Sequence, residues 1–199
     1  MKHERVTEPP LHEADLRFFW ATPSRWKDVE LLFGERGACG GCWCMTWRLE
    51  RGAYEKGKTG GNRRTLKKLV ESSRRPGVIV YHGREPVAWC AVAPREEYSF
   101  LARSRVLAPV DDARVWSITC LFVARPWRRR GVSALLLRAA ARMAVARGAC
   151  IVEGYPQQPA AENSPDPFVW TGLPSAFRKA GFREVLRRSR ARPIMRYTP

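Results

Sequence analysis

The sequence predicts an α/β fold with a mixed β-sheet. Residues 115–155 read as strand, loop, helix and strand, an order that gives two parallel strands joined by a right-handed crossover. Residues 78–81 and 87–93 are short apolar runs separated by a turn, which indicates an antiparallel hairpin. A length of 199 residues fits one domain. We therefore expect residues 1–199 to form a single domain, with residues 1–12 as a flexible N-terminus.

The N-terminal part is predicted to contribute one strand and two helices. Residues 15–21 are apolar and aromatic, as in a strand. Thr22-Pro23-Ser24 then supplies a turn and an N-cap for a helix over residues 25–33. A second amphipathic helix is expected over residues 62–75, and Pro76-Gly77 ends it.

The central unit begins with residues 115–123, whose β-branched and aromatic side chains are typical of a buried strand. Apolar side chains recur at helical spacing from Val132 to Met143, and Gly148 is placed to end this helix. A second strand follows at residues 149–155. The remaining predicted elements are a helix near Phe100, a helix over 174–180, and strands over 182–188 and 194–197.

The turn between the first strand and the helix has the chemistry of an anion site. It reads Arg125-Pro126-Trp127-Arg128-Arg129-Arg130-Gly131, and the helix starts directly after it. The first N–H groups of a helix have no partner within the helix, and the helix dipole is positive there. Gly131 has no Cβ, so a phosphate or pyrophosphate can approach the backbone closely.

Arg128-Arg129-Arg130-Gly131-Val132-Ser133 resembles the Arg/Gln-x-x-Gly-x-Gly/Ala acyl-CoA signature of the GNAT superfamily of N-acetyltransferases. The late segment Phe177-Arg178-Lys179-Ala180-Gly181-Phe182 is similar to the late helix and Gly-Phe of that family. The resemblance implies a GNAT-like mixed, mostly antiparallel sheet, with a central splayed parallel strand pair and helices on both faces. It also implies acetyl-CoA as cosubstrate. The cofactor-binding residues it implies are Leu121, Phe122, Val123, Arg128, Arg129, Arg130, Gly131, Val132, Ser133 and Ala134.

The catalytic residues are less defined by the resemblance. The family often uses a tyrosine of the late helix as general acid, but the matching position here is Phe177, which cannot donate a proton. Glu153 and Tyr155 share one face of a strand by period two, and we expect them to be the catalytic pair. A role for Glu153 in an ion pair fits equally well, and Glu96, Glu97, Asp111 and Asp112 are the alternative bases.

A cysteine-rich segment reads Cys39-Gly-Gly-Cys42-Trp43-Cys44-Met45-Thr46-Trp47. Structural zinc needs four ligands, and the segment offers three cysteines with no histidine near them in sequence. We therefore expect no metal. In the GNAT architecture the early helices and loops cover the acceptor side, so Trp43, Cys44 and Trp47 are predicted to line the substrate pocket.

Residues 52–59 carry the letters Gly-x-x-x-x-Gly-Lys-Thr of a phosphate-binding P-loop. A P-loop must leave a buried strand and enter a helix at once, whereas charged residues precede this stretch and Gly60-Gly61 follow it. We predict a surface loop here and keep a nucleotide hydrolase as a competing class of function.

The net charge of +17 has three competing interpretations: it attracts acidic ligands, beginning with CoA phosphates, it marks a nucleic-acid or ribosome contact, or it reflects a codon bias toward arginine with no partner implied. Nucleic acid is the less favoured partner, because no nucleic-acid-binding motif accompanies the charge. No stretch is long and apolar enough to span a membrane, and no signal core opens the chain, so a cytoplasmic protein is expected. We predict an N-acetyltransferase for a small-molecule or peptide amine, with homodimer formation left open. The alternative is a non-catalytic binding module for acyl-CoA or nucleic acid.

Overall fold

A computed structural model describes residues 9–159 and 170–199. It contains a seven-stranded sheet with the order β1-β2-β3-β4-β5-β7-β6. The neighbours are antiparallel except for β4 and β5, which are parallel. The strands are β1 (Leu16–Trp20), β2 (Gly77–His82), β3 (Glu85–Pro94), β4 (Trp116–Val123), β5 (Val152–Gly154), β6 (Arg183–Ser189) and β7 (Arg192–Tyr197).

The parallel pair is splayed. Strand β4 pairs with β3 along its whole length, but with β5 only over Trp116, Ser117 and Ile118. Among residues 9–159 and 170–199, no strand pairs with the rest of β4 on its β5 side. This arrangement confirms the predicted mixed sheet, and it leaves one edge of β4 open at the centre of the molecule.

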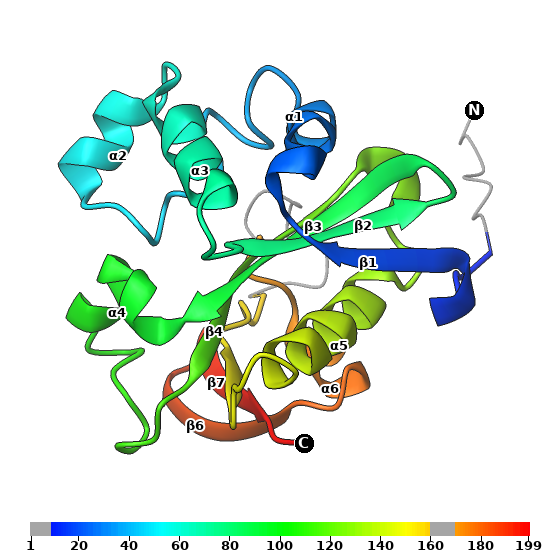
Figure 1. Ribbon diagram of the computed structural model, residues 1–199. Coiled ribbons are helices and arrows are strands. Elements are labelled where there is room, and N and C mark those ends of the chain that lie inside the picture. The colour runs from blue at the N-terminus through cyan, green and yellow to red at the C-terminus, as the bar shows by residue number, and fades with distance from the viewer. Residues whose placement is uncertain (1–8, 160–169) are drawn as a thin grey trace, which may run out of the picture.

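Helices cover both faces of the sheet (Figure 1). On one face lie α1 (Trp26–Phe33), α2 (Arg51–Gly57) and α3 (Gly61–Glu71), and on the other lie α5 (Val132–Val145) and α6 (Pro174–Lys179). The short α4 (Ser99–Arg103) follows β3. Single 3-10 turns occur at Glu13–Asp15, Pro23–Arg25, Arg95–Glu97 and Arg125–Trp127. Within residues 9–159 and 170–199, no helix is both long and apolar enough to traverse a bilayer.

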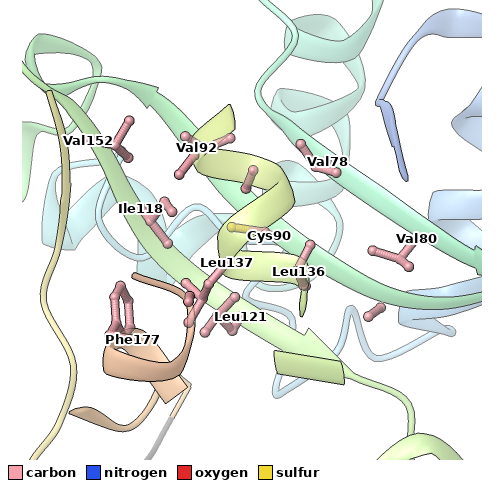
Figure 2. Close-up of a cluster of buried hydrophobic side chains, with 14 of the residues drawn as sticks. Val78, Val80, Cys90, Val92, Ile118, Leu121, Leu136, Leu137, Val152 and Phe177 are labelled. Atoms are coloured by element: carbon pink, nitrogen blue, oxygen red, sulfur yellow. The ribbon is translucent and has the colours of Figure 1, made fainter. Parts of the chain in front are cut away.

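Each face has its own apolar core. On the α5 face, Leu136 and Leu137 pack toward Val78, Val80 and Cys90 of the sheet (Figure 2). On the other face, Val29 and Phe33 of α1 and Leu66 and Val70 of α3 pack with Trp89. A smaller cluster around Trp47, Tyr98 and Tyr155 fills the end of the sheet near α4. These cores hold β4 between two layers, so its open edge has a fixed position.

The predicted elements match the structure with two corrections. The stretch with P-loop letters is helix α2 followed by a turn, so the prediction of a surface loop was wrong there. Because turns, and not a strand, lead directly into α2, the P-loop interpretation fails as well. The buried side chain of Asn62 holds this helix in place, since its amide donates to the carbonyl oxygens of Gly41 (2.9 Å) and Tyr54 (3.1 Å).

The second correction concerns the strand predicted over residues 149–155, which contains only Val152–Gly154. At its end, a side chain on Gly154 would collide with the ring of Phe177, because an added Cβ would lie 1.9 Å from Cε1. Phe177 thus packs over the end of β5. Of the predicted flexible N-terminus, residues 1–8 lie outside the described part of the chain.

Candidate functional site

The open edge of β4 forms one side of the site. The N–H of Trp116 donates to the carbonyl of Ile151 (3.0 Å) on the β5 side. Farther along β4, the N–H of Leu121 points to the same side and donates to the carbonyl of Trp170 (2.7 Å). The two residues are an odd number of positions apart, so an irregularity must separate them. It is a bulge in β4, because Ala91 and Val92 of β3 pair with Cys120 and Ile118 and leave Thr119 as the extra residue.

The basic turn follows β4 directly and leads into α5. Gly131 is the N-cap of α5 and has φ +83°, a left-handed conformation that favours glycine. Val132 then begins the right-handed helix. Successive left- and right-handed residues aim their N–H groups into a common concavity that binds anions. A Cβ added at Gly131 would meet no atom within 4 Å, so the space beside this backbone is open.

The arginines of the turn point in different directions. Arg128 Nε donates to the carbonyl oxygen of Val123 (2.9 Å), and both Arg128 and Arg129 line the cavity described below. Arg130 instead donates to the carbonyl of Pro9 (3.1 Å), with its guanidinium 4.9 Å from the ring centroid of Trp127. Arg130 does not line the cavity, unlike the other residues predicted to bind cofactor.

A cavity of about 670 Å³ connects the open edge of β4 with the start of α5. One half is formed by β4, the basic turn and α6, and it contains the cationic side chains. The other half is formed by residues 38–54 and by Trp170, and it is mostly apolar and aromatic. The residues that line the cavity include Leu121, Phe122, Val123, Arg128, Arg129, Gly131, Val132, Ser133, Ala134, Cys44, Trp47, Cys120 and Trp170.

Two of the three residues predicted to bind substrate line this cavity. Cys44 and Trp47 do so, whereas Trp43 does not. Trp43 is buried and packs on Phe33 and Trp26, with ring centroids 5.5 Å and 6.1 Å away. Trp43 and Cys44 both have positive φ (43° and 54°), so the chain turns sharply between the buried tryptophan and the cavity.

Several lining residues were not among those predicted to bind cofactor or substrate. Cys120 and Thr119 come from the irregular part of β4, and Trp170 stacks edge-on against Trp47 with ring centroids 5.6 Å apart. Tyr54 comes from α2, inside the misread P-loop letters. Lys179 at the end of α6 adds a cation. The sequence signal for Cys120 was its position in a predicted strand, and this position is equally typical of a cysteine in the core.

Glu153 and Tyr155 lie together but away from the cavity lining. Tyr155 Oη donates to Glu153 Oε2 (2.8 Å), and Arg95 Nη1 donates to Tyr155 Oη (2.7 Å). Arg196 Nε donates to the other Glu153 oxygen (2.9 Å). Glu153 is 1% exposed and Tyr155 is fully buried, so a carboxylate is held here by two guanidinium groups.

The surroundings of Tyr155 change the pKa of its phenol group. Burial, with the nearby charge of Glu153 as the next cause, raises the pKa of the Tyr155 phenol well above its ordinary value. Tyr155 therefore stays protonated at neutral pH. Its ring centroid lies 5.7 Å from that of Trp47, so the network contacts the cavity wall through an aromatic side chain. The catalytic role predicted for Glu153 and Tyr155 remains a prediction.

The alternative carboxylates are also placed by the structure. Glu97 accepts from Arg48 (2.5 Å), whose side chain is only 5% exposed, and Asp111 accepts from Arg196 (2.6 Å). Glu96 and Asp112 are exposed on the surface. None of these four carboxylates lines the cavity.

The comparisons with known proteins agree with this geometry. A family model described as the acetyltransferase (GNAT) family matches residues 43–163. The comparison with curated proteins gave no match.

Among solved structures, similar ones include the PaiA N-acetyltransferase of Thermoplasma acidophilum in complex with coenzyme A. It has a TM-score of 0.51 and 10% identity, and the match covers 92% of this chain and 99% of that one. For NAA60 of Arabidopsis thaliana in complex with acetyl-CoA, the TM-score is 0.50 with 13% identity, over 92% and 99% of the chains. A GNAT acetyltransferase of Streptococcus agalactiae gives 0.54 and 13%, over 92% and 95%.

The family match extends over more than half of the chain, and it includes β4, the basic turn and α5. It confirms the predicted resemblance and supports acetyl-CoA as the cosubstrate. This chain belongs to the acetyltransferase (GNAT) family.

Proposed function

We propose that the protein is an N-acetyltransferase that moves the acetyl group of acetyl-CoA to a primary amine by direct attack. The observation that carries the proposal is one continuous cavity that joins the open edge of β4 to the glycine turn at the start of α5. A thioester ligand with a pyrophosphate needs both features, because a strand edge pairs with its amides and a helix N-terminus binds its phosphates.

The residues present fit such a ligand. The open space beside Gly131 admits a phosphate to the first N–H groups of α5, and Arg128 and Arg129 add positive charge. On the β5 side of β4, the Leu121 N–H donates to the Trp170 carbonyl, and the Val123 carbonyl oxygen accepts from Arg128 Nε. In this proposal the pantetheine arm replaces Trp170 as the partner of Leu121 and pairs with Val123 beside Arg128, and the bound acetyl-CoA supplies the activated acyl group.

The other half of the cavity would receive the amine. Trp47, Trp170 and Cys44 give it an apolar and aromatic wall, and Thr46 adds a hydroxyl group. Alkylamines are mostly charged at neutral pH and must lose a proton before they attack, since the reference pKa of lysine is about 10.4. No carboxylate or imidazole lines the cavity in the described ranges 9–159 and 170–199, which favours proton loss to water.

Glu153 and Tyr155 fit a positioning role better than direct proton transfer. The Glu153 carboxylate already accepts hydrogen bonds from Arg95, Arg196 and Tyr155. The ring of Tyr155 packs against Trp47. A base that accepts a substrate proton must come within hydrogen-bond reach of the substrate. The positioning role and the catalytic role predict different pH profiles of kcat/KM for a Glu153→Gln variant.

A turnover screen tests the proposed function. Acetyl-CoA is incubated with the protein and with amines, amino acids, polyamines, aminoglycosides or peptides, and acetylated products are detected by mass spectrometry. We expect at least one acceptor whose acetylation depends on the protein.

A non-catalytic acyl-CoA-binding module is the second candidate, because Phe177 stands where the family often has a tyrosine acid. Phe177 is fully buried, 5.0 Å from Phe182 between ring centroids. Saturable acetyl-CoA binding without acetylation of any acceptor would favour this second function. Absence of both binding and transfer would contradict both candidates.

A further inference from the structure

Two cysteines from distant parts of the chain meet in the cavity wall. Cys44 Sγ donates to Cys120 Sγ at 3.2 Å, although the residues are 76 positions apart in sequence. Both line the cavity. Cys44 is 5% exposed, and Cys120 on β4 is more accessible. The contact therefore places two thiols side by side where a small solute can reach at least one of them.

The surrounding structure holds this contact in place. Cys120 belongs to β4, which is paired with β3 through Ala91. Cys44 follows the buried Trp43, whose ring packs against α1 through Phe33. Both cysteines are therefore held by packed elements, so the two sulfurs are pre-oriented for contact.

We propose that Cys44 and Cys120 are a redox-active dithiol, which a hydroperoxide converts to a disulfide within the folded protein. In the first step the Cys120 sulfur attacks one oxygen of hydrogen peroxide; an S–O bond forms, the O–O bond breaks, and water leaves. In the second step the Cys44 sulfur attacks the Cys120 sulfur; the S–S bond forms, the S–O bond breaks, and a second water leaves. Two electrons pass from the thiols to the peroxide, and the two thiol protons end on the two waters.

The order of the steps follows from the environments of the two sulfurs. Cys120 is the more exposed to the cavity, and it accepts the S–H of Cys44. The pKa of Cys44 is raised well above its ordinary value, mainly by the hydrogen bond to Cys120 and next by burial. The raised pKa makes Cys44 the poorer first nucleophile, so Cys120 reacts with the peroxide, and Cys44 passes its proton to the leaving hydroxyl group as it attacks in the second step.

Little movement is required to form the bond. A disulfide has an S–S length of about 2.05 Å, so the sulfurs must approach by roughly 1.1 Å from their present contact. The disulfide would tie residues 38–47 to β4 at the residue before Leu121. The wall shared by the two halves of the cavity would then be cross-linked.

The other cysteines are the natural competitors. Cys42 donates its thiol to the carbonyl of Gly37 (3.2 Å), and burial raises its pKa to about 11. Cys39 and Cys150 are exposed, and Cys90 is fully buried. Cys39 and Cys42 have the spacing of a Cys-x-x-Cys pair, so a Cys39–Cys42 disulfide is the main alternative product.

Peptide mapping separates these products. The reduced protein is treated with hydrogen peroxide, its remaining thiols are blocked, and it is digested with trypsin without reduction. Cleavage gives residues 37–48, which contain Cys39, Cys42 and Cys44, and residues 115–128, which contain Cys120. We expect these two peptides to be joined in most of the oxidised protein, with a mass about 2 Da below their sum.

Variants identify the partner within residues 37–48. The cross-link should persist in the Cys39→Ser/Cys42→Ser double variant and disappear in both Cys44→Ser and Cys120→Ser. Circular dichroism checks that each variant is folded, and the double variant keeps the test informative if one single variant is not. Dithiothreitol should release the two peptides.

Three results would overturn the proposal: a disulfide confined to residues 37–48, oxidation of Cys120 to the sulfinic acid without a cross-link, or no reaction of the folded protein. Acetyl-CoA binding is measured on the same samples before oxidation. Because the dithiol chemistry does not depend on CoA, a missing cross-link and a missing cofactor site are distinguished.

Discussion

Arg128 Nε lies 2.9 Å from the carbonyl oxygen of Val123, and this hydrogen bond joins the end of β4 to the turn that begins α5. One side chain thus fixes the strand edge relative to the helix N-terminus. That contact holds in a single geometry the two features that we propose to bind different parts of an acyl-CoA ligand.

Replacement of Arg128 tests this coupling. Arg128→Ala removes a cavity cation and the hydrogen bond to Val123, so we expect acetyl-CoA to bind roughly 10- to 150-fold more weakly, as charge-assisted hydrogen bonds are worth about 1.5–3 kcal/mol. Titration calorimetry measures the change. Arg142→Ala is the matched control, because Arg142 lies on α5, the helix that follows the turn, and is exposed and pairs with Glu13 outside the cavity. Equal loss of affinity in the two variants would show that overall charge, rather than the site, attracts the ligand.

The two ends of α5 offer a matched pair of glycines. Gly131 and Gly148 both have positive φ (83° and 91°), and a Cβ at either would meet nothing within 4 Å. Gly131→Ala and Gly148→Ala should each lower the free energy of unfolding by about 1–2 kcal/mol, because alanine is strained in this conformation. Only Gly131→Ala places a methyl group where a phosphate approaches, so only that variant should lose CoA affinity, by tenfold or more. The assignment of the turn is contradicted if both variants bind CoA equally well.

Glu153 separates a positioning role from a catalytic one. Glu153→Gln removes the charge that pairs with Arg95 and Arg196 in a buried site, and we expect the free energy of unfolding to fall by about 3–5 kcal/mol. Glu184→Gln, at an exposed pair with Arg187, should cost no more than about 1 kcal/mol. Urea unfolding measures both variants.

The pH profile of kcat/KM then decides the role of Glu153. If Glu153 only positions its neighbours, the folded Glu153→Gln variant keeps the acidic limb of the profile while its rate falls. Loss of that limb, with CoA binding intact, would identify Glu153 as the general base.

The acid limb of stability should depend on Asp111. Hydrogen bonds from Arg196, with a smaller contribution from the N–H of Ala113, lower the pKa of this carboxyl to about 2. Because the pKa is lower in the folded than in the unfolded chain, the stabilising effect is present above the ordinary pKa of about 3.9 and is lost as the pH falls toward 2. Asp111→Asn should therefore flatten the fall in melting temperature between about pH 4 and pH 2. Asp112→Asn, one residue away and exposed, should leave that slope unchanged.

The parts of the site that sequence reasoning located are those with local signals. The apolar run before the turn, the glycine at the start of α5 and the arginines between them are contiguous, so the edge of β4 and the anion site were both predicted. Period two also placed Glu153 and Tyr155 on one face, and their side chains do meet at 2.8 Å. The sequence did not reveal that Arg95 and Arg196 close around them, because those arginines come from distant segments.

The sequence failed mainly to predict the direction of side chains in irregular segments. Trp43 and Cys44 are neighbours with positive φ, and one enters the core while the other lines the cavity. Arg130 turns toward Pro9, although it is next to two arginines that line the cavity. The contact between Cys44 and Cys120 joins two segments 76 residues apart, so no local pattern indicates it. The prediction of a surface loop over residues 52–59 was wrong because Ala53, Tyr54 and Glu55 are compatible with a helix, which Asn62 stabilises.

Hydrogen–deuterium exchange with and without acetyl-CoA tests most directly whether the cavity between β4 and α5 is the cofactor site. Bound ligand would accept hydrogen bonds from the N–H groups at the start of α5 and would exclude water from the open edge of β4. The account predicts slower exchange in peptides that contain residues 121–123 and 131–134, while α3 and β6 stay unchanged. Unchanged exchange at both segments under saturating acetyl-CoA, or protection confined to residues 52–59, would contradict it.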